Sequence, residues 1–427
     1  MNHGWIRWTV AYLLLLTGVA SISAQMLAGA WVDQSEKRID EVRKTELRVI
    51  VMDALGRAVP GAAVVIDQIR SEFPVGVVLP ENGLPDVDLD SEFWRVVNAV
   101  SLERMTGWPK LQPEGGGSLD DDAVWRIEQV LNEAEARGML VRWGPLVSAD
   151  AGRMPGWAAK LEGRALADAV ASYADLVCKR FGRRIDQFDG YTQTLDHSFI
   201  ENRAGVGVLR DLYESLPATC PGVVVCARFD DALGTGRINK MLRQLTAMRE
   251  AFIPVPLVAI DHRFGDTVEQ KSLARLFSRI DPIDQPVILS GLTVGGDSEL
   301  NAAINLETVL RTVMEKPKVQ GIWFAGLTHD NAIELNSELT DEAGVLTSSA
   351  RAIDSLYHDV WRTHIQTKTD ELGNVRARAF PGTYRVNATL ADGTELSAEF
   401  RLKKTDAPRV VLLEPLRPGA ALGQTPE

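Results

Sequence analysis

Eight short apolar, β-rich runs recur along the middle of the chain, and segments with a helical pattern separate them. The runs cover residues 73–79, 96–102, 139–147, 185–191, 222–228, 256–262, 286–292 and 319–327. Strands that are apolar almost throughout are typical of a parallel sheet with both faces covered. The alternation therefore predicts an α/β fold, namely a (β/α)8 TIM barrel. An open doubly wound sheet is the second candidate, but no G-x-G-x-x-G follows an early strand.

The flanks of the predicted barrel differ from it, because they consist of short strands divided by turns. Residues 46–67 contain two predicted strands, too few to be stable alone, and residues 375–414 contain a further series. Our hypothesis is one small all-β sandwich module, split by insertion of the barrel, in which both flanks share a sheet. The predicted boundaries are 45–70 and 363–415 for the two parts of the sandwich, 71–362 for the barrel and 416–427 for a disordered tail.

Turn residues in both flanks agree with a split sandwich. The stretch from Asp53 to Ala62, with its Gly and Pro residues, resembles the opening of transthyretin-like or carboxypeptidase-regulatory-like β-sandwiches. The stretch from Asp370 to Tyr384 resembles the second half of the same pattern. The resemblance implies that the two flanks form one module.

The N-terminus has the pattern of a secretory signal peptide over residues 1–24. Arg7 provides a positive n-region, residues 9–19 form an apolar h-region, and small residues lead up to Ala24. The apolar run is shorter than the ~20 residues of a spanning helix, so cleavage is favoured over retention as a membrane anchor. We therefore expect a secreted or periplasmic protein with no membrane association after signal cleavage.

Three cysteines are present, Cys178, Cys220 and Cys226. Cys220 and Cys226 are joined by a predicted extended segment, which holds its ends too far apart for a bridge, and three cysteines cannot all pair within one chain. We expect structural thiols and no disulfide framework. Neither C-x-x-C nor H-E-x-x-H occurs, so no metal site and no cofactor are expected.

Four stretches of the predicted barrel resemble glycoside hydrolase family 10, the endo-β-1,4-xylanase family. They are FPVG at 73–76, NAVSLERMTGWPKLQPEG at 98–115, RFGRRIDQFDGYTQ at 180–193 and QPVILSGLTV at 285–294. Their order and spacing are similar to those of the family. The resemblance covers roughly residues 71–362 and implies a barrel of polysaccharide metabolism, with a xylan-type β-1,4-glycan as ligand.

The resemblance also implies that both catalytic glutamates of the family are missing. Retaining glycosidases use two carboxyl groups ~5–5.5 Å apart. The family's acid/base position, at the end of strand four, matches Gln193, whose carboxamide forms hydrogen bonds but cannot donate a proton as an acid. The nucleophile position, at the end of strand seven, matches Gly291, and the sugar-clamping histidine after strand three matches Gly144.

Residues near the predicted strand ends can still form a sugar-binding groove, because barrel active sites lie at this face. The candidate sugar-binding residues are Glu103, Trp108, Arg142, Trp157, Tyr191, Gln193 and His262. For the two tryptophans, packing of the barrel rim is an equally good interpretation, because Trp is largely buried in most proteins. A relocated pair of catalytic carboxylates would come from Asp230, Asp261 and Asp330.

Three functions are compatible with this pattern. The first, which we favour, is a secreted, catalytically degenerate family-10-like protein that binds a polysaccharide or oligosaccharide. The second is an active glycosidase with relocated carboxylates, and the third is a non-enzymatic extracellular interaction scaffold. Nucleic acid is not an expected partner, because the formal net charge of −12 repels phosphate backbones.

Overall fold

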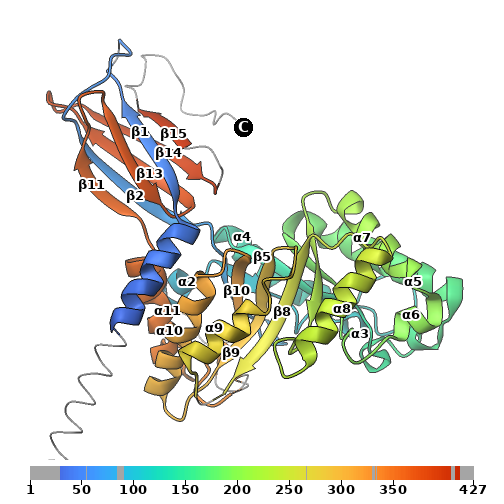
Figure 1. Ribbon diagram of the computed structural model, residues 1–427. Helices are drawn as coiled ribbons and strands as arrows, with labels where there is room; N and C mark the ends of the chain where they lie inside the picture. The colour runs from blue at the N-terminus through green and yellow to red at the C-terminus, as the bar shows by residue number, and fades with distance from the viewer. Residues whose placement is uncertain are drawn as a thin grey trace, which may run out of the picture.

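The chain forms a closed β-barrel ringed by helices and, beside it, a smaller module of two β-sheets (Figure 1). The computed structural model describes residues 29–53, 55–83, 91–265, 267–328, 332, 334–404 and 409–413. The predicted signal peptide (1–24), the predicted tail (416–427) and Asp330 lie outside these residues. Within them, no helix combines the length and apolar character needed to cross a membrane.

Eight parallel strands make up the barrel, and they are arranged in the order in which they occur along the chain. They are β3 (Val75–Val78), β4 (Ala99–Ser101), β5 (Leu140–Ser148), β6 (Gln187–Thr192), β7 (Val224–Phe229), β8 (Leu257–Phe264), β9 (Val287–Val294) and β10 (Val319–Ala325). The barrel closes because β10 pairs with β3. Each strand coincides with one of the eight predicted runs, so the predicted fold class is confirmed.

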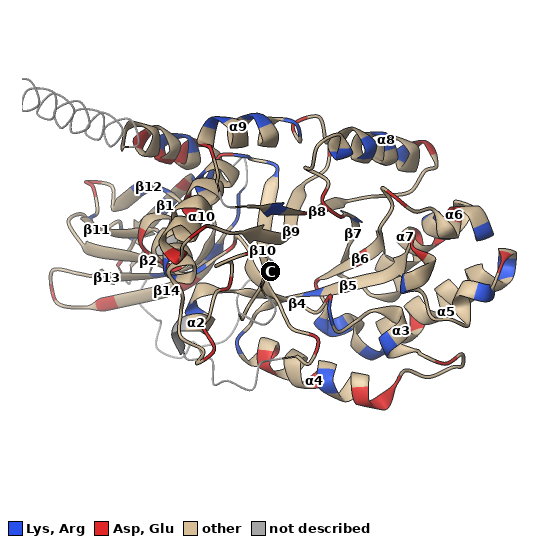
Figure 2. Cartoon of the chain, turned by 90° about the horizontal axis from the view of Figure 1, so that it is seen from below, with Lys and Arg blue, Asp and Glu red and all other residues tan. Residues whose placement is uncertain are grey.

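Helices cover the outside of the barrel. They are α2 (Ser91–Val96), α3 (Trp108–Leu111), α4 (Asp121–Ala136), α5 (Gly163–Phe181), α6 (Phe199–Ala204), α7 (Gly207–Thr219), α8 (Arg237–Glu250), α9 (Gln270–Ser278), α10 (Glu299–Met314) and α11 (Ser348–Asp354). In α4, the Asp120 carboxylate caps the N-terminus, and Ile127, Val130 and Leu131 form a buried face. Lys, Arg, Asp and Glu are spread over such helices in Figure 2, whereas most of the strand ribbon is uncharged.

The smaller module consists of two sheets that share one hydrophobic core. In the first, β1 (Thr45–Val51) lies between β12 (Asn374–Ala379) and β15 (Arg409–Leu413); the second has the order β11 (His364–Lys368), β2 (Ala63–Ser71), β13 (Gly382–Thr389), β14 (Glu395–Leu402). Each sheet therefore combines strands from both flanks of the barrel. Burial alternates along β13, as expected for a strand with one face covered. The likeness to transthyretin-like sandwiches stays a prediction.

A helix over residues 29–43 lies between the module and the barrel (Figure 1). Its buried Arg43 donates hydrogen bonds to the carbonyl oxygens of Met314 at 2.8 Å and of Lys316 and Val319 at 2.7 Å. These carbonyls lie where α10 ends and β10 begins, and the last carbonyls of a helix have no donor within it. Burial lowers the pKa of Arg43 to about 10, so the guanidinium stays charged at neutral pH. Arg43 thus ties this helix to the end of the barrel at which β10 starts.

Cys178 and Cys220 form a disulfide, which corrects the expectation of structural thiols. Cys178 lies in the last turn of α5, and Cys220 follows the C-terminus of α7. Packing of these two helices brings the Cα atoms to 5.5 Å, within the usual range for a bridge. The sequence argument considered only the separation between Cys220 and Cys226 along the chain. Cys226 is a buried free thiol.

Candidate functional site

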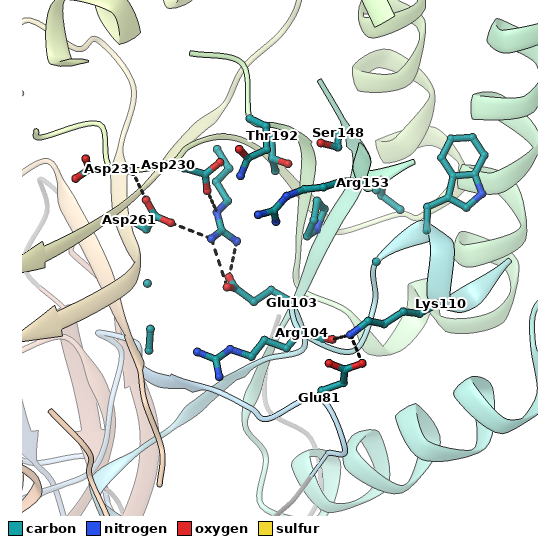
Figure 3. A pocket seen from close by; sticks show the side chains of 18 of the residues that line it. Glu81, Glu103, Arg104, Lys110, Ser148, Arg153, Thr192, Asp230, Asp231 and Asp261 are labelled. Carbon is teal, nitrogen blue, oxygen red and sulfur yellow. Dashed lines mark hydrogen bonds and ion pairs between the residues drawn. The ribbon is translucent and has the colours of Figure 1, made fainter. Parts of the chain in front are cut away.

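A pocket of about 770 Å³ lies at the mouth of the barrel, where the parallel strands end. Thr192 at the end of β6, Asp230 just after β7, Asp261 on β8 and Ala325 at the end of β10 all line it. This is the face at which barrel enzymes carry their active sites. Figure 3 shows side chains that converge on the pocket from several of these strand ends.

The floor of the pocket is organised around the guanidinium of Arg228, which is only 8% exposed. Arg228 donates hydrogen bonds to Glu103 and, at 3.1 Å, to Asp261, and its Nε lies 3.1 Å from Asp230 Oδ1 (Figure 3). Burial disfavours the charged guanidinium, but the carboxylates of Glu103, Asp230, Asp261 and Asp189 outweigh this effect and hold the pKa of Arg228 well above its usual value. The guanidinium of Arg228 therefore stays positively charged and holds together carboxylates that come from separate strands.

A second arginine–carboxylate pair lies beneath this floor. Arg142 on β5 and Asp189 on β6 are both fully buried and are joined by hydrogen bonds. Asp189 also lies 3.4 Å from Arg228 Nη1. Burial raises the pKa of Asp189, whereas the charges of Arg142 and Arg228 lower it. Together with Glu103, Asp230 and Asp261, four carboxyl groups therefore surround two guanidiniums.

Asp230 is one of these carboxyl groups, and its pKa is raised. Burial raises the pKa of its carboxyl to about 7; the charge of Arg228 opposes this rise, and the charge of Asp261 adds to it. Asp230 therefore keeps a proton for part of the time at neutral pH and can then donate a hydrogen bond. Beside it, His262 Nδ1 lies 2.9 Å from Asp231 Oδ1, and burial lowers the pKa of the imidazole.

Gln193 and Gly291 line the same pocket. Gln193 follows β6 with a φ of 63°, a left-handed conformation that residues other than glycine rarely adopt. Such strained residues cluster at functional sites. Gly291 on β9 pairs with Asp261 on β8, and a Cβ added at Gly291 would lie 3.1 Å from the Asp261 Cβ. Asp261 thus occupies the space beside Gly291.

About two thirds of the chain can be superimposed on solved structures of xylanases. Xylanase 10B from Thermotoga petrophila RKU-1 in complex with xylobiose matches with a TM-score of 0.56 and 16% sequence identity, covering 67% of this chain and 94% of that one. A psychrophilic glycoside hydrolase family 10 endo-β-1,4-xylanase matches with a TM-score of 0.57 and 12% identity, covering 66% and 96%. The barrel has the family 10 fold.

Two curated relatives extend the comparison to the sequence. The anti-sigma-I factor RsgI6 of Acetivibrio thermocellus is 22% identical over 364 residues, which cover 84% of this chain and 47% of the relative. Endo-1,4-beta-xylanase 1 of Arabidopsis thaliana is 20% identical over 406 residues, covering 94% and 42%. The chain thus spans about half the length of the curated relatives it matches. It matches no protein-family model.

The structure shows where the positions that the resemblance singled out lie in the barrel. Gln193 follows the fourth strand of the barrel and Gly291 lies on the seventh, as β6 and β9 respectively. At Gly144 on β5, a Cβ would lie 2.3 Å from the Glu103 Cα and 2.8 Å from the Thr106 Oγ1. Since any side chain at Gly144 would collide with backbone, a histidine would not fit there.

Most of the predicted site residues meet in the pocket, and the ones that line it are Glu103, Trp108, Gln193, Asp230, Asp261, His262 and Gly291. Arg142 and Tyr191, which we expected to bind sugar, are not among them. Arg142 lies deep in the barrel beneath the floor, and Tyr191 is buried, its hydroxyl donating to Glu201 of α6. Arg142 lies before the end of β5 at Ser148, and Tyr191 lies before the end of β6 at Thr192. The prediction that both lie at strand ends therefore placed them too close to the mouth of the barrel.

The two tryptophans pack the rim of the barrel. Trp108 is 2% exposed, stacks on Tyr173 and donates a hydrogen bond to Gln112 Oε1 at 2.9 Å. Trp157 contacts Trp108 edge to face, donates to the Gln112 carbonyl at 3.2 Å and does not line the pocket. Trp157 therefore packs the rim of the barrel, as the alternative interpretation holds. Trp108 packs the rim as well, although a small part of it lines the pocket.

The pocket residues that the sequence analysis missed include four arginines, namely Arg104, Arg153, Arg228 and Arg263. Arg228 could have been found, because it ends an otherwise apolar run, GVVVCAR, and a charge on a buried strand needs partners. No comparable signal marks Arg153 or Arg263, since exposed arginines are common on any surface. Among the described residues, no group of three or more His, Cys, Asp or Glu side chains is placed to hold a metal ion.

Proposed function

We propose that this chain is a secreted or periplasmic, family-10-like protein that binds a xylan-type β-1,4-glycan at the mouth of its barrel and does not cleave it by double displacement. The observation that carries the proposal is that Gln193 and Gly291 line one pocket and neither has a carboxyl group. The xylanases among the structural and curated relatives support the class of glycan. The predicted signal peptide supports export.

Double displacement needs an acid/base and a nucleophile on either side of the glycosidic bond. The Gln193 carboxamide stays uncharged, so it offers a donor and an acceptor to a sugar hydroxyl but no acidic proton. Gly291 has no side chain with which to attack. Loss of general acid catalysis alone typically costs ~10²–10⁴ in rate, and loss of the nucleophile removes the covalent route.

The pocket nevertheless offers what a sugar needs for binding. Gln193, His262 and the partly protonated Asp230 each have a polar group at its surface, and together they include donors and acceptors. Ligand sites of this kind combine a preformed concave surface with a few placed polar groups. Of the three, Asp230 belongs to the arginine–carboxylate floor through its contact with Arg228, and His262 is oriented by Asp231, 2.9 Å from its Nδ1.

Hydrolysis through relocated carboxyls is the second candidate, because a pKa of about 7 at Asp230 suits a general acid at neutral pH. The position of Asp261, the nearest acid to Asp230, disfavours this route. Asp230 and Asp261 come from neighbouring strands and each lies 3.1 Å from the same guanidinium. Their carboxyl groups therefore lie side by side, whereas a glycosidase pair must flank the bond.

The test is affinity electrophoresis of the purified chain, from residue 25 onward, in gels that contain xylan, with release of reducing sugar measured in the same samples. We expect retarded migration and no turnover above the blank. Gln193→Gly keeps the left-handed backbone and removes the carboxamide, and should weaken binding roughly fivefold, as expected for one hydrogen bond. Phe252→Gly is the matched control, because Phe252 is left-handed as well but lies outside the pocket.

The alternatives give different results in this experiment. Turnover that Asp230→Asn abolishes would support the relocated acid and contradict the proposal. If the protein shows no retardation and no turnover, the result would favour the interaction scaffold. Equal losses of binding in Gln193→Gly and Phe252→Gly would show that the variants act through the backbone and not through the carboxamide.

A further inference from the structure

Two arginines on the wall of the pocket differ from Arg228 and Lys110, which line it as well. Arg153 ends the short 3-10 helix η1 (Ala151–Arg153) that follows β5, and Arg263 lies near the end of β8. Both side chains are exposed. In the described parts of the chain, neither guanidinium has an ion pair or a hydrogen bond. Figure 3 shows the Arg153 side chain extending into the pocket from its wall.

Two further cations that line the same pocket are already neutralised. Arg228 is surrounded by carboxylates, and Lys110 forms an ion pair with Glu81 at 2.7 Å. Arg153 and Arg263 therefore keep all their donors available. A guanidinium presents five N–H groups in a planar fork, which matches two oxygens of a carboxylate or a sulfate far better than a single sugar hydroxyl.

We propose that Arg153 and Arg263 select a glycan that carries anionic groups, either uronic-acid carboxylates or sulfate esters. This inference rests on the proposed function, since the backbone of the glycan has to lie in the same pocket. The two arginines enter from β5 and β8, with β6 and β7 between them. They therefore lie on either side of Gln193 and Asp230, which follow β6 and β7, so that anionic substituents of one bound chain reach both arginines.

Because the molecule as a whole is negatively charged, the attraction of these two arginines for an anionic glycan can be measured separately. The formal net charge of −12 repels an anionic glycan at long range, so any attraction must come from local positive groups. Because both arginines are exposed, their interaction with an anion is screened by salt over a Debye length of ≈ 10 Å at 0.1 M. A preference for anionic glycans should therefore be present at low salt and decline as salt is added.

The experiment compares glucuronoxylan with the same polymer after reduction of its carboxyl groups to alcohols, by affinity electrophoresis at low salt. The reduced polymer after chemical sulfation forms a third arm, which distinguishes sulfate recognition from carboxylate recognition. We expect at least one anionic polymer to bind roughly fivefold more tightly than the reduced polymer, as two exposed ion pairs allow. In about 1 M salt, where the Debye length falls to ≈ 3 Å, the difference should disappear.

Variants assign the preference to the two arginines. Arg153→Gln/Arg263→Gln should bind the anionic and reduced polymers equally, with the affinity of the wild type for the reduced polymer. Arg249→Gln, an exposed arginine in the last turn of α8, is the control and should keep the preference. A preference that survives in the double variant overturns the assignment. Equal binding of all polymers by the wild type overturns the inference and leaves the proposed function standing, whereas binding of none overturns both.

Discussion

The floor and the wall of the pocket contain the same kind of side chain in opposite situations. On the floor, Arg228 and Arg142 are buried and carboxylates surround them, whereas on the wall Arg153 and Arg263 are exposed and unpaired. A buried charge needs a counter-ion, and an exposed one is stabilised by water. The floor arginines therefore hold the barrel mouth in shape, and the wall arginines are available to a ligand.

Replacement of Arg228 tests this contrast with the largest expected effect. Arg228→Met leaves the partly buried carboxylate of Asp261 without its counter-ion and leaves Glu103 only Arg142, 3.6 Å away, which should destabilise the protein by about 3–5 kcal/mol. The free energy of unfolding in urea measures the loss. Arg153→Met is the matched control and should change it by less than about 0.5 kcal/mol. Similar losses in the two variants would refute the contrast between floor and wall.

The pH dependence of stability tests whether the floor holds more acid than its arginines neutralise. The pKa of Asp230 is raised from 3.8 to about 7, so the folded state keeps a proton that the unfolded state releases above pH 4. Its contribution to stability is fully present below pH 4 and is lost as the pH rises through 7, by up to about 4 kcal/mol.

Asp230→Asn removes this dependence. Relative to the wild type, the variant should gain stability between pH 4 and pH 8, as measured by urea unfolding at a series of pH values. A difference between variant and wild type that does not vary with pH would contradict the raised pKa.

The sequence was a better guide to the barrel than to its pocket, and the reason is physical. Apolar strand runs and helix caps are local patterns, so all eight strands could be predicted. Gln193 and Gly291 were found through a resemblance to family motifs. The role of Arg228 depends on Glu103, Asp230 and Asp261, which only the closed barrel brings together, and the bridge between Cys178 and Cys220 likewise depends on the packing of two helices.

A smaller effect is expected from Gly144, where the floor meets the rim. Gly144→Ala would place a Cβ 2.3 Å from the Glu103 Cα, so the loop that presents Glu103 to Arg228 would have to move, at a cost of about 1–3 kcal/mol. Gly156→Ala is the control in a neighbouring loop, because a Cβ there meets nothing within 4 Å. Thermal unfolding of both variants measures the cost. If Gly144→Ala leaves the temperature of thermal unfolding unchanged, the loop that presents Glu103 can move at little energetic cost.

The last prediction is an absence of effect. If the pocket had lost only two catalytic groups, Gln193→Glu/Gly291→Glu would restore xylan hydrolysis. We expect no reducing sugar above the blank, because the new Cβ at position 291 would lie 3.1 Å from the Asp261 Cβ, and its carboxylate would join a floor in which four carboxyl groups already surround two guanidiniums. Gly144 also leaves no room for a residue that clamps the sugar. Hydrolysis by the double variant would contradict this prediction and show that the arginine–carboxylate floor is compatible with catalysis.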